Sequence, residues 1–169
     1  MYNFKQVLEE ILNKIPNDVI NIISSYLSFT PLTKNELQDA VDLWCKNKEK
    51  ALKIYGHISN LDTSNITDMR YLFKGLNKFN ENINNWNVSN VVYMEGMFES
   101  CTNFNQPLNN LDVSNVTCMT GMFICCREFN QPLNKWNVSK VKNMKNMFEG
   151  CIYFNQPIHE WNWSLLNIS

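Results

Sequence analysis

Residues 86–110 read WNVSNVVYMEGMFESCTNFNQPLNN, and residues 111–135 read LDVSNVTCMTGMFICCREFNQPLNK. The two segments align without a gap, and the same text recurs over residues 61–85 and 136–160. A fifth copy begins at Trp161. Self-similarity at a fixed period of this size predicts a solenoid, in which each 25-residue unit is one layer stacked on the next.

Each unit reads as a short extended piece followed by an apolar turn. The extended piece does not alternate strictly between apolar and polar residues, which predicts a bend within it. In the third unit, Met119, Met122 and Phe123 stand at i, i+3 and i+4, the spacing of a short helix that faces the core. A unit is therefore expected to be a strand plus a helical turn, whose apolar face only its neighbours can cover.

The charges of the chain are balanced, with 15 Lys and Arg against 16 Asp and Glu and a formal net charge of −1. Neither the repeats nor the first 60 residues form a basic block, which argues against nucleic acid or an anionic membrane as the main partner. The N-terminus lacks the apolar core of a signal peptide, and no run of about 18 apolar residues occurs. We therefore expect an intracellular, cytoplasmic protein.

Cys101, Cys126 and Cys151 occupy one repeat position, where the first unit has Leu76. A position that accepts either Leu or Cys is typical of a buried apolar slot, so reduced thiols are expected there. The cysteines show no C-x-x-C or Cys/His spacing, which argues against a zinc site. His57 stands alone, with no carboxylate or Cys near it in sequence. We therefore expect no enzyme activity, no metal and no cofactor.

The chain divides into three parts. Residues 1–30 are expected to form an N-terminal helical hairpin, residues 31–60 a helical lead-in, and residues 61–169 the four repeats plus the partial fifth. The second helix of the hairpin is apolar over more than one stripe, so it is expected to need partners on two sides.

The helical lead-in carries clear capping signals. Thr33 and Glu36 form a capping box, which predicts a helix that starts at this point. Its expected apolar face consists of Leu37, Ala40, Val41 and Trp44. A shorter helix is expected between Asn47, as its N-cap, and Gly56 at its end.

Residues 15–27 read IPNDVINIISSYL and resemble the opening helix of an F-box, the motif that docks onto the Skp1 adaptor of ubiquitin ligases. The resemblance covers this helix only, and residues 30–55 would have to supply the rest of an F-box. It implies docking through Ile15, Pro16, Val19, Ile20, Ile23 and Leu27. The alternative is that the hairpin only caps the open N-terminal end of the repeats, as any repeat protein requires.

The second unit carries the text Trp86-Asn87-Val88-Ser89-Asn90-Val91, then Met94, Met97-Phe98, Cys101 and Phe104-Asn105-Gln106-Pro107-Leu108. This text resembles the Mycoplasma-lipoprotein-type repeat of BspA-like leucine-rich repeat proteins, and residues 36–44 and 55–58 resemble the segment that precedes such arrays. The resemblance implies an α+β repeat solenoid. In this fold a right-handed, leucine-rich-repeat-like solenoid has a short parallel sheet and helical turns, and N-terminal α-helices cap it. It also implies binding rather than catalysis, with no ligand common to its members.

Positions that differ between copies and lie next to the expected strand are the candidate partner-binding residues. They are Gln106, Asn110, Gln131, Lys135, Gln156 and Glu160. Two recurring columns remain open to two interpretations. The Asn residues, such as Asn105 and Asn130, form either an internal ladder of stacked amides or a row that reads a ligand. The Trp/Leu residues at the start of each unit belong either to the core or to an exposed binding row.

These features favour a non-enzymatic protein–protein interaction module of the leucine-rich-repeat type, with a protein partner of unknown identity. One alternative is an F-box-like substrate receptor that links a bound protein to a Skp1-containing ubiquitin ligase. Another is a structural protein that self-associates through its incomplete C-terminal unit.

Overall fold

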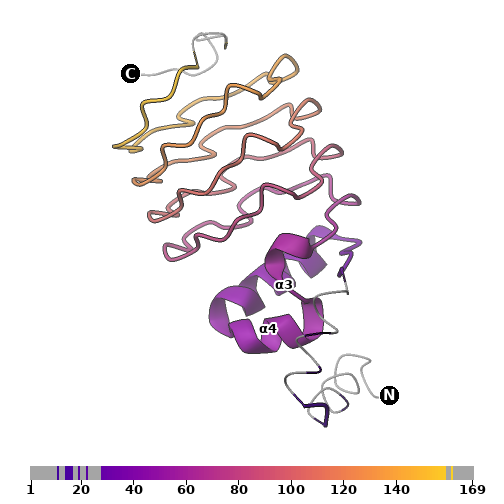
Figure 1. The fold of residues 1–169 in the computed structure, drawn as a ribbon. Coiled ribbons are helices and arrows are strands. Elements are labelled where there is room, and N and C mark those ends of the chain that lie inside the picture. The colour runs from indigo at the N-terminus through magenta and orange to yellow at the C-terminus, as the bar shows by residue number, and fades with distance from the viewer. Residues whose placement is uncertain are drawn as a thin grey trace.

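The computed structural model describes residues 11, 14–16, 19, 22, 28–158 and 161. Two α-helices, α3 (Lys34–Lys46) and α4 (Lys48–Tyr55), are followed by a short 3-10 helix, η1 (Ile58–Asn60). The repeats then lie one above another in a stack that extends away from the helices (Figure 1).

The stack consists of four layers, each of which is one 25-residue segment. The layers are termed units 1 to 4 and start at Leu61, Trp86, Leu111 and Trp136. Positions within a unit are numbered 1 to 25 from these residues. Ile58 stands 25 residues before Ile83 and is buried like it, so the register already begins in η1.

Both helices begin and end where their capping residues predict. Thr33 Oγ1 accepts the backbone N–H of Glu36 at 3.2 Å, which starts α3. Asn47 Oδ1 accepts the backbone N–H of Lys50 at 3.0 Å, and Gly56 follows the last residue of α4. The predicted apolar face of α3 is confirmed, because all four of its residues are buried: Leu37, Ala40, Val41 and Trp44.

The two helices close the N-terminal end of the stack. The side-chain amide of Gln38 donates to the Leu72 carbonyl at 3.0 Å, and Lys34 Nζ lies 3.2 Å from Asp68 Oδ1. The buried residues of α3, α4 and all four units form one hydrophobic core. The helices are therefore bound to unit 1 by apolar packing and by polar contacts to its turn.

The predicted α+β architecture is wrong. Within residues 28–158 the structure contains no β-strand, and the units contain no α-helix. Neighbouring units are linked by isolated parallel bridges, which join Asp68, Tyr93, Cys118 and Asn143 one after another. The expected leucine-rich-repeat-like solenoid, with its parallel sheet and helical turns, is not the fold of this chain.

Two left-handed residues in every unit explain this result. At position 11 they are Tyr71, Gly96, Gly121 and Asn146, and at position 15 they are Gly75, Ser100, Cys125 and Gly150. Their φ angles lie between 56° and 76°. Helices and strands both need negative φ, so neither can run through positions 11 to 15. Met119, Met122 and Phe123, expected on one helical turn, lie instead in consecutive turns closed by hydrogen bonds from residue i+3 to residue i.

Backbone N–H groups in this turn region have two alternating destinations. At positions 9, 11, 13 and 15 the N–H donates to a carbonyl of the next unit, at position 8, 10, 12 or 14. In unit 2, Met94 donates to the Cys118 carbonyl at 3.0 Å and Phe98 donates to the Met122 carbonyl at 2.9 Å. The N–H groups of positions 12, 14 and 16 close turns within their own unit. The turn region is therefore directional, with donors toward the following unit and acceptors toward the preceding one.

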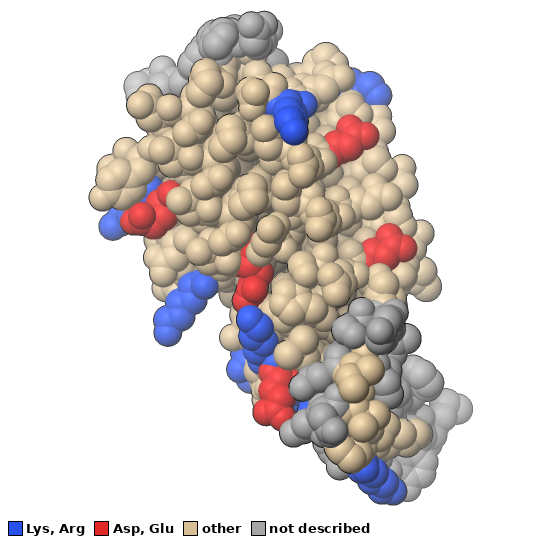
Figure 2. All heavy atoms as spheres, in the orientation of Figure 1, with Lys and Arg blue, Asp and Glu red and all other residues tan. Residues whose placement is uncertain are grey.

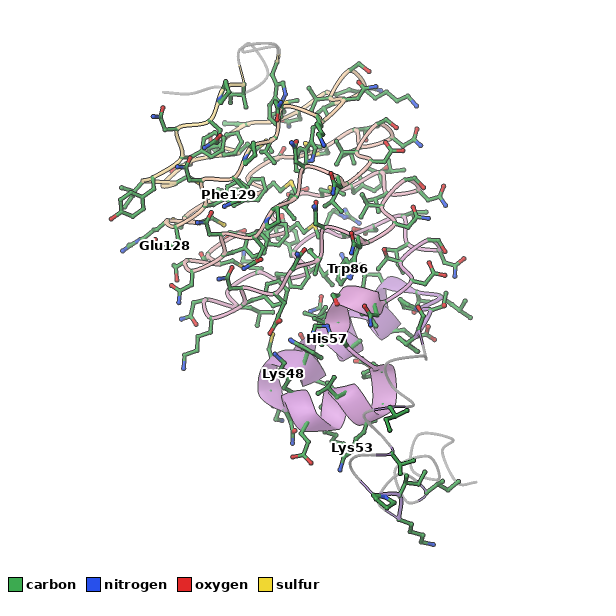
Figure 3. The ribbon with its side chains drawn as sticks, viewed as in Figure 1. Lys48, Lys53, His57, Trp86, Glu128 and Phe129 are labelled. Atoms are coloured by element: carbon green, nitrogen blue, oxygen red, sulfur yellow. The ribbon has the colours of Figure 1, made fainter. Side chains whose placement is uncertain are left out.

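Two columns of phenylalanines fill the core. They are Phe73, Phe98, Phe123 and Phe148 at position 13, and Phe79, Phe104, Phe129 and Phe154 at position 19. Ring centroids of successive units lie 5.1 to 6.0 Å apart with interplanar angles of at most 12°. Figure 3 shows Phe129 within the stack, whereas its neighbour Glu128 lies toward a corner. Only at the C-terminal end are the rings of Phe148 and Phe154 partly exposed.

Candidate protein-binding surface

The exposed large apolar side chains in the described part of the stack lie in two places. On units 1 and 2, Tyr71 and Tyr93 are 41% and 44% exposed. On unit 4, Ile152 and Tyr153 are 68% and 60% exposed. Exposed tyrosines on a rigid scaffold are typical of protein-binding sites. The first pair consists of two tyrosines and the second of only one, so the first pair is the stronger candidate.

Five side chains from units 1 and 2 form this surface, termed the tyrosine patch: Asp68, Arg70, Tyr71, Tyr93 and Glu95. The Arg70 guanidinium binds the Asp68 carboxylate with 2.6 Å between Nη2 and Oδ2. Its Cζ lies 5.2 Å from the centroid of the Tyr93 ring, within reach of a cation–π interaction. The Tyr71 hydroxyl donates a short hydrogen bond to Glu95. Each tyrosine is thus held by a charged neighbour while much of its ring remains exposed.

Gly96 makes room for the Tyr71 ring. Both residues stand at position 11, in consecutive units, and both have positive φ. A Cβ atom on Gly96 would overlap the Tyr71 ring, so the ring lies close against the backbone of unit 2. A side chain that is already ordered loses less entropy when a partner binds.

The charges of the tyrosine patch are fixed at neutral pH. Burial opposes ionisation of Asp68, but hydrogen bonds from Arg70 and Lys34 outweigh it and lower its pKa to about 2. The hydrogen bond to Glu95 raises the pKa of Tyr71, which keeps its hydroxyl protonated. The patch therefore presents charged side chains of both signs beside its two tyrosines.

A pocket of about 400 Å³ lies where α3 and α4 meet unit 1. Its lining includes Trp44, Cys45, Lys48, Phe79 and Glu81. Lys48 Nζ lies 2.7 Å from Glu81 Oε1 and 4.7 Å from the Trp44 ring centroid. Burial, together with two nearby carboxylates, raises the pKa of the Cys45 thiol, which disfavours the nucleophilic thiolate. These contacts join the helices to the stack and leave the pocket a weaker candidate site.

His57 lies at the same junction, beside Lys48 in Figure 3. Its Nδ1 accepts the backbone N–H of Ser59 at 3.2 Å and so caps η1. Its ring meets the Trp44 ring edge-on, with centroids 4.7 Å apart. Burial lowers the pKa of His57, so the ring is held in the neutral form that accepts this hydrogen bond.

A family model described as "Mycoplasma protein of unknown function, DUF285" matches residues 43–161, which is more than half of the chain. The chain belongs to the DUF285 family. The match confirms the Mycoplasma type of the repeats and adds no support for the leucine-rich-repeat or F-box resemblance. No curated protein and no solved structure matches the chain. In the described part of this DUF285 chain, no helix is long and apolar enough to cross a bilayer.

Two of the predicted partner-binding residues join DUF285 units to one another. The side-chain amide of Gln131 donates to Asn105 Oδ1 at 3.0 Å, and that of Gln156 donates to Asn130 Oδ1 at 2.9 Å. Both glutamines are partly buried. Their amide donors are therefore engaged inside the protein, and a role in partner binding stays a prediction.

The other four predicted residues do not lie in the tyrosine patch. Gln106 is partly buried, the side chains of Asn110 and Lys135 are exposed, and Glu160 lies outside the described residues. The sequence did contain a signal for the patch. Position 8 reads Asp, Tyr, Cys and Asn in units 1 to 4, and an aromatic residue in such a variable, outward column indicates a contact surface.

The predicted F-box-like docking residues are only partly within the described residues. Ile15 is partly buried, Pro16 is exposed, and Val19 is 39% exposed. Ile20, Ile23 and Leu27 lie outside the described residues. Docking to Skp1 stays a prediction.

Both recurring columns serve the stack itself, the Trp/Leu column as part of the core and the Asn column as links between units. All four residues of the Trp/Leu column that start units 2 to 5 are buried: Trp86, Leu111, Trp136 and Trp161. The indole N–H of Trp86 donates to the Ile58 carbonyl at 2.8 Å. In the Asn column, Asn80 Oδ1 accepts the backbone N–H of Asn105 at 3.0 Å, and the contact repeats in the later units. The asparagines therefore hold the layers together.

The cysteine column is also structural. Cys101 and Cys126 are buried and carry free thiols. Each Sγ donates to a carbonyl of the preceding unit at 2.8 Å, from Cys101 to Phe73 and from Cys126 to Phe98. Burial raises the pKa of Cys101 to about 12 and that of Cys126 further. Both thiols stay protonated, as the Leu/Cys alternation at this position predicts.

Proposed function

We propose that this chain is a non-enzymatic protein-binding module that contacts its partner through the tyrosine patch. The observation that carries the proposal is the exposure of Tyr71 and Tyr93 on adjacent units, with Arg70 against one ring. Tyrosine and arginine are among the residues that contribute most to binding at protein interfaces. The repeated backbone hydrogen bonds beneath them supply a rigid base.

The polar groups of the patch favour a partner that supplies a hydrogen-bond acceptor. Arg70 donates to Asp68 through Nε and Nη2. Its Nη1 has no hydrogen-bond partner among the described residues and points to an acceptor on the partner, such as a carboxylate or a backbone carbonyl. The paired charges around it would add specificity and register more than affinity.

The test is a comparison of captured proteins between the intact chain and the double variant Arg70→Ala, Tyr93→Ala. These substitutions remove the stacked pair at positions 10 and 8. The matched control is Asn143→Ala, Lys145→Ala, because residues 143 and 145 occupy positions 8 and 10 of unit 4. Both variants change exposed side chains, so circular dichroism should show folded proteins.

We expect at least one partner, cross-linked to units 1 and 2 of the intact chain, to be lost with the patch variant and retained with the control. Loss of a central aromatic or arginine contact typically costs 2 kcal/mol or more, roughly a thirtyfold drop in affinity. Equal capture by all three proteins would contradict the proposal.

A further inference from the structure

The last unit carries a row of backbone donors that have no acceptor among the described residues. In units 1 to 3 the N–H groups of positions 9, 11, 13 and 15 all donate to the following unit. The equivalent groups of unit 4, termed the donor row, are those of Met144, Asn146, Phe148 and Gly150. Within the described residues, none of these four N–H groups donates a hydrogen bond. A row of unpaired backbone donors can pair with the carbonyls of another chain.

The unit that carries the donor row also has incompletely buried apolar residues. Phe148 and Phe154 end the two phenylalanine columns and are only partly buried. Ile152 and Tyr153 of the same unit are exposed. The same two positions are polar in the earlier units: Asn77 and Lys78, Thr102 and Asn103, Arg127 and Glu128. The apolar pair thus occurs in the unit whose donor row has no acceptor among the described residues.

A second copy of this chain does not fit the donor row. Its own acceptor edge, on unit 1, lies against α3, where Gln38 already donates to the Leu72 carbonyl and Lys34 pairs with Asp68. Two copies joined through unit 4 would instead place donors opposite donors. The hydrogen-bonding direction of the stack therefore argues against both kinds of end-to-end self-association.

We propose that the donor row binds a segment of another polypeptide that has the sequence pattern of positions 8 to 15 and takes their turn conformation. The segment supplies carbonyl oxygens from alternate residues, as Cys118 and Met122 do for unit 2. Its phenylalanine stacks on Phe148 and continues the column. Its residues at positions 11 and 15 must accept positive φ, for which Gly is best suited, because the matching backbone is left-handed there. The recognisable pattern is Met-x-Gly-Met-Phe-x-Ser.

The experiment uses the full chain and a synthetic peptide of residues 92–104, which reads VYMEGMFESCTNF and carries the acceptor carbonyls that unit 1 uses. Amide hydrogen exchange of the full chain is followed as peptide is added. At about ten times the dissociation constant, exchange of the donor row should slow about tenfold, while exchange in units 1 to 3 stays unchanged.

Matched controls distinguish pairing with the donor row from nonspecific binding of the peptide. A peptide with Gly96→Val cannot take the left-handed conformation and should not protect the donor row. In the full chain, Ile152→Lys, Tyr153→Lys should weaken protection, whereas Thr102→Lys, Asn103→Lys at the same positions of unit 2 should not.

Two results would overturn the proposal. One is unchanged exchange at the donor row up to about 1 mM peptide, a concentration at which even a weak complex forms. The other is equal protection by the Gly96→Val peptide. The tyrosine patch is tested separately, because the Arg70→Ala, Tyr93→Ala chain should bind the peptide as the intact chain does.

Discussion

The two ends of the stack present different backbone groups, carbonyls at one end and N–H groups at the other. At the N-terminal end, unit 1 turns its carbonyl edge toward α3, and the side chains of Gln38 and Lys34 reach the turn of that unit. At the C-terminal end, the corresponding N–H groups of unit 4 have no acceptor among the described residues, and Phe148 and Phe154 are only partly buried. Amide and ammonium side chains can donate to carbonyls, whereas a row of N–H groups needs acceptors. The direction of the hydrogen bonds therefore gives the two ends different requirements.

The distribution of charge follows the same division. Figure 2 shows few charged side chains over the visible middle of the stack, with most of them on its margins and over the helical end. Ion pairs at the helical end include Lys34 with Asp68 and Lys48 with Glu81. The contacts that recur between the layers are neutral, namely the asparagine contacts, the backbone bonds and the stacked rings, and Lys74 with Glu99 adds an ion pair between units 1 and 2.

The largest difference in stability is expected between variants of two phenylalanines that occupy the same position in different units. Phe98→Ala removes a fully buried ring with a stacked neighbour on either side, so it should lower the free energy of unfolding by about 3–5 kcal/mol. Phe148→Ala removes a partly exposed ring, and its cost should be about half as large or less. Urea denaturation of both variants measures the difference. Equal losses would mean that the C-terminal edge is as well covered as the interior.

Thiol reactivity should rank the cysteines of one column in the same way. Cys101 and Cys126 are fully buried, whereas Cys151 in unit 4 is partly exposed. Alkylation of Cys101 and Cys126 requires local opening, and an opening that costs about 1.4 kcal/mol slows a reaction tenfold. We expect Cys151 to react at least about tenfold faster, as measured by mass spectrometry of the native protein. A faster reaction at Cys101 would contradict the ranking.

Loss of a single hydrogen bond at the N-terminal end of the stack should lower the stability less than loss of Phe98 does. Gln38→Ala leaves the Leu72 carbonyl without its donor and should cost about 1 kcal/mol, because an internal hydrogen bond contributes roughly that much. Thermal unfolding measures the change. Asp42→Ala is the control, since it removes the second acceptor of Gln38 and leaves the bond to Leu72. Equal destabilisation of the control and of Gln38→Ala would contradict the stabilising role of the bond to Leu72.

The smallest effect is expected from the ion pair at the same end. The pKa of Asp68 is about 2 in the folded chain, against an ordinary value of 3.8. Because the folded-state pKa is lowered, its contribution is complete above pH 3.8 and is lost as the pH falls toward 2. Asp68→Asn should remove this part of the pH dependence of stability. Unfolding curves between pH 5 and 2 measure it, and the change in the free energy of unfolding should be less than about 1 kcal/mol. An unchanged pH profile would contradict the assignment.

The repeat register and the buried columns could be predicted because each column repeats its residue type. Position 9 is Met and position 13 is Phe in every unit, and such strict columns indicate a stacked core. The backbone of the turn could not be predicted in the same way. Its left-handed position 11 reads Tyr71, Gly96, Gly121 and Asn146, so glycine marks only half of the copies. The Met and Phe spacing alone then favoured a helix that the structure does not contain.

The candidate surface was missed for a related reason. A site within one unit repeats with the period, but the tyrosine patch combines Tyr71 from position 11 of unit 1 with Tyr93 from position 8 of unit 2. Its position depends on the stacking of neighbouring units, which brings Arg70 against Tyr93. Comparison of copies column by column finds conserved core positions, whereas a patch of this kind requires comparison across adjacent layers.

The most direct test of the directional stack is amide hydrogen exchange of the unbound chain, resolved by residue. The account predicts strong protection of the interior donors Met94, Gly96, Phe98 and Ser100, which bond to unit 3. It predicts faster exchange for Asn146, Phe148 and Gly150 of the donor row, which are not fully buried and whose N–H groups lack acceptors among the described residues. Protection of the donor row equal to that of the interior donors would contradict the account.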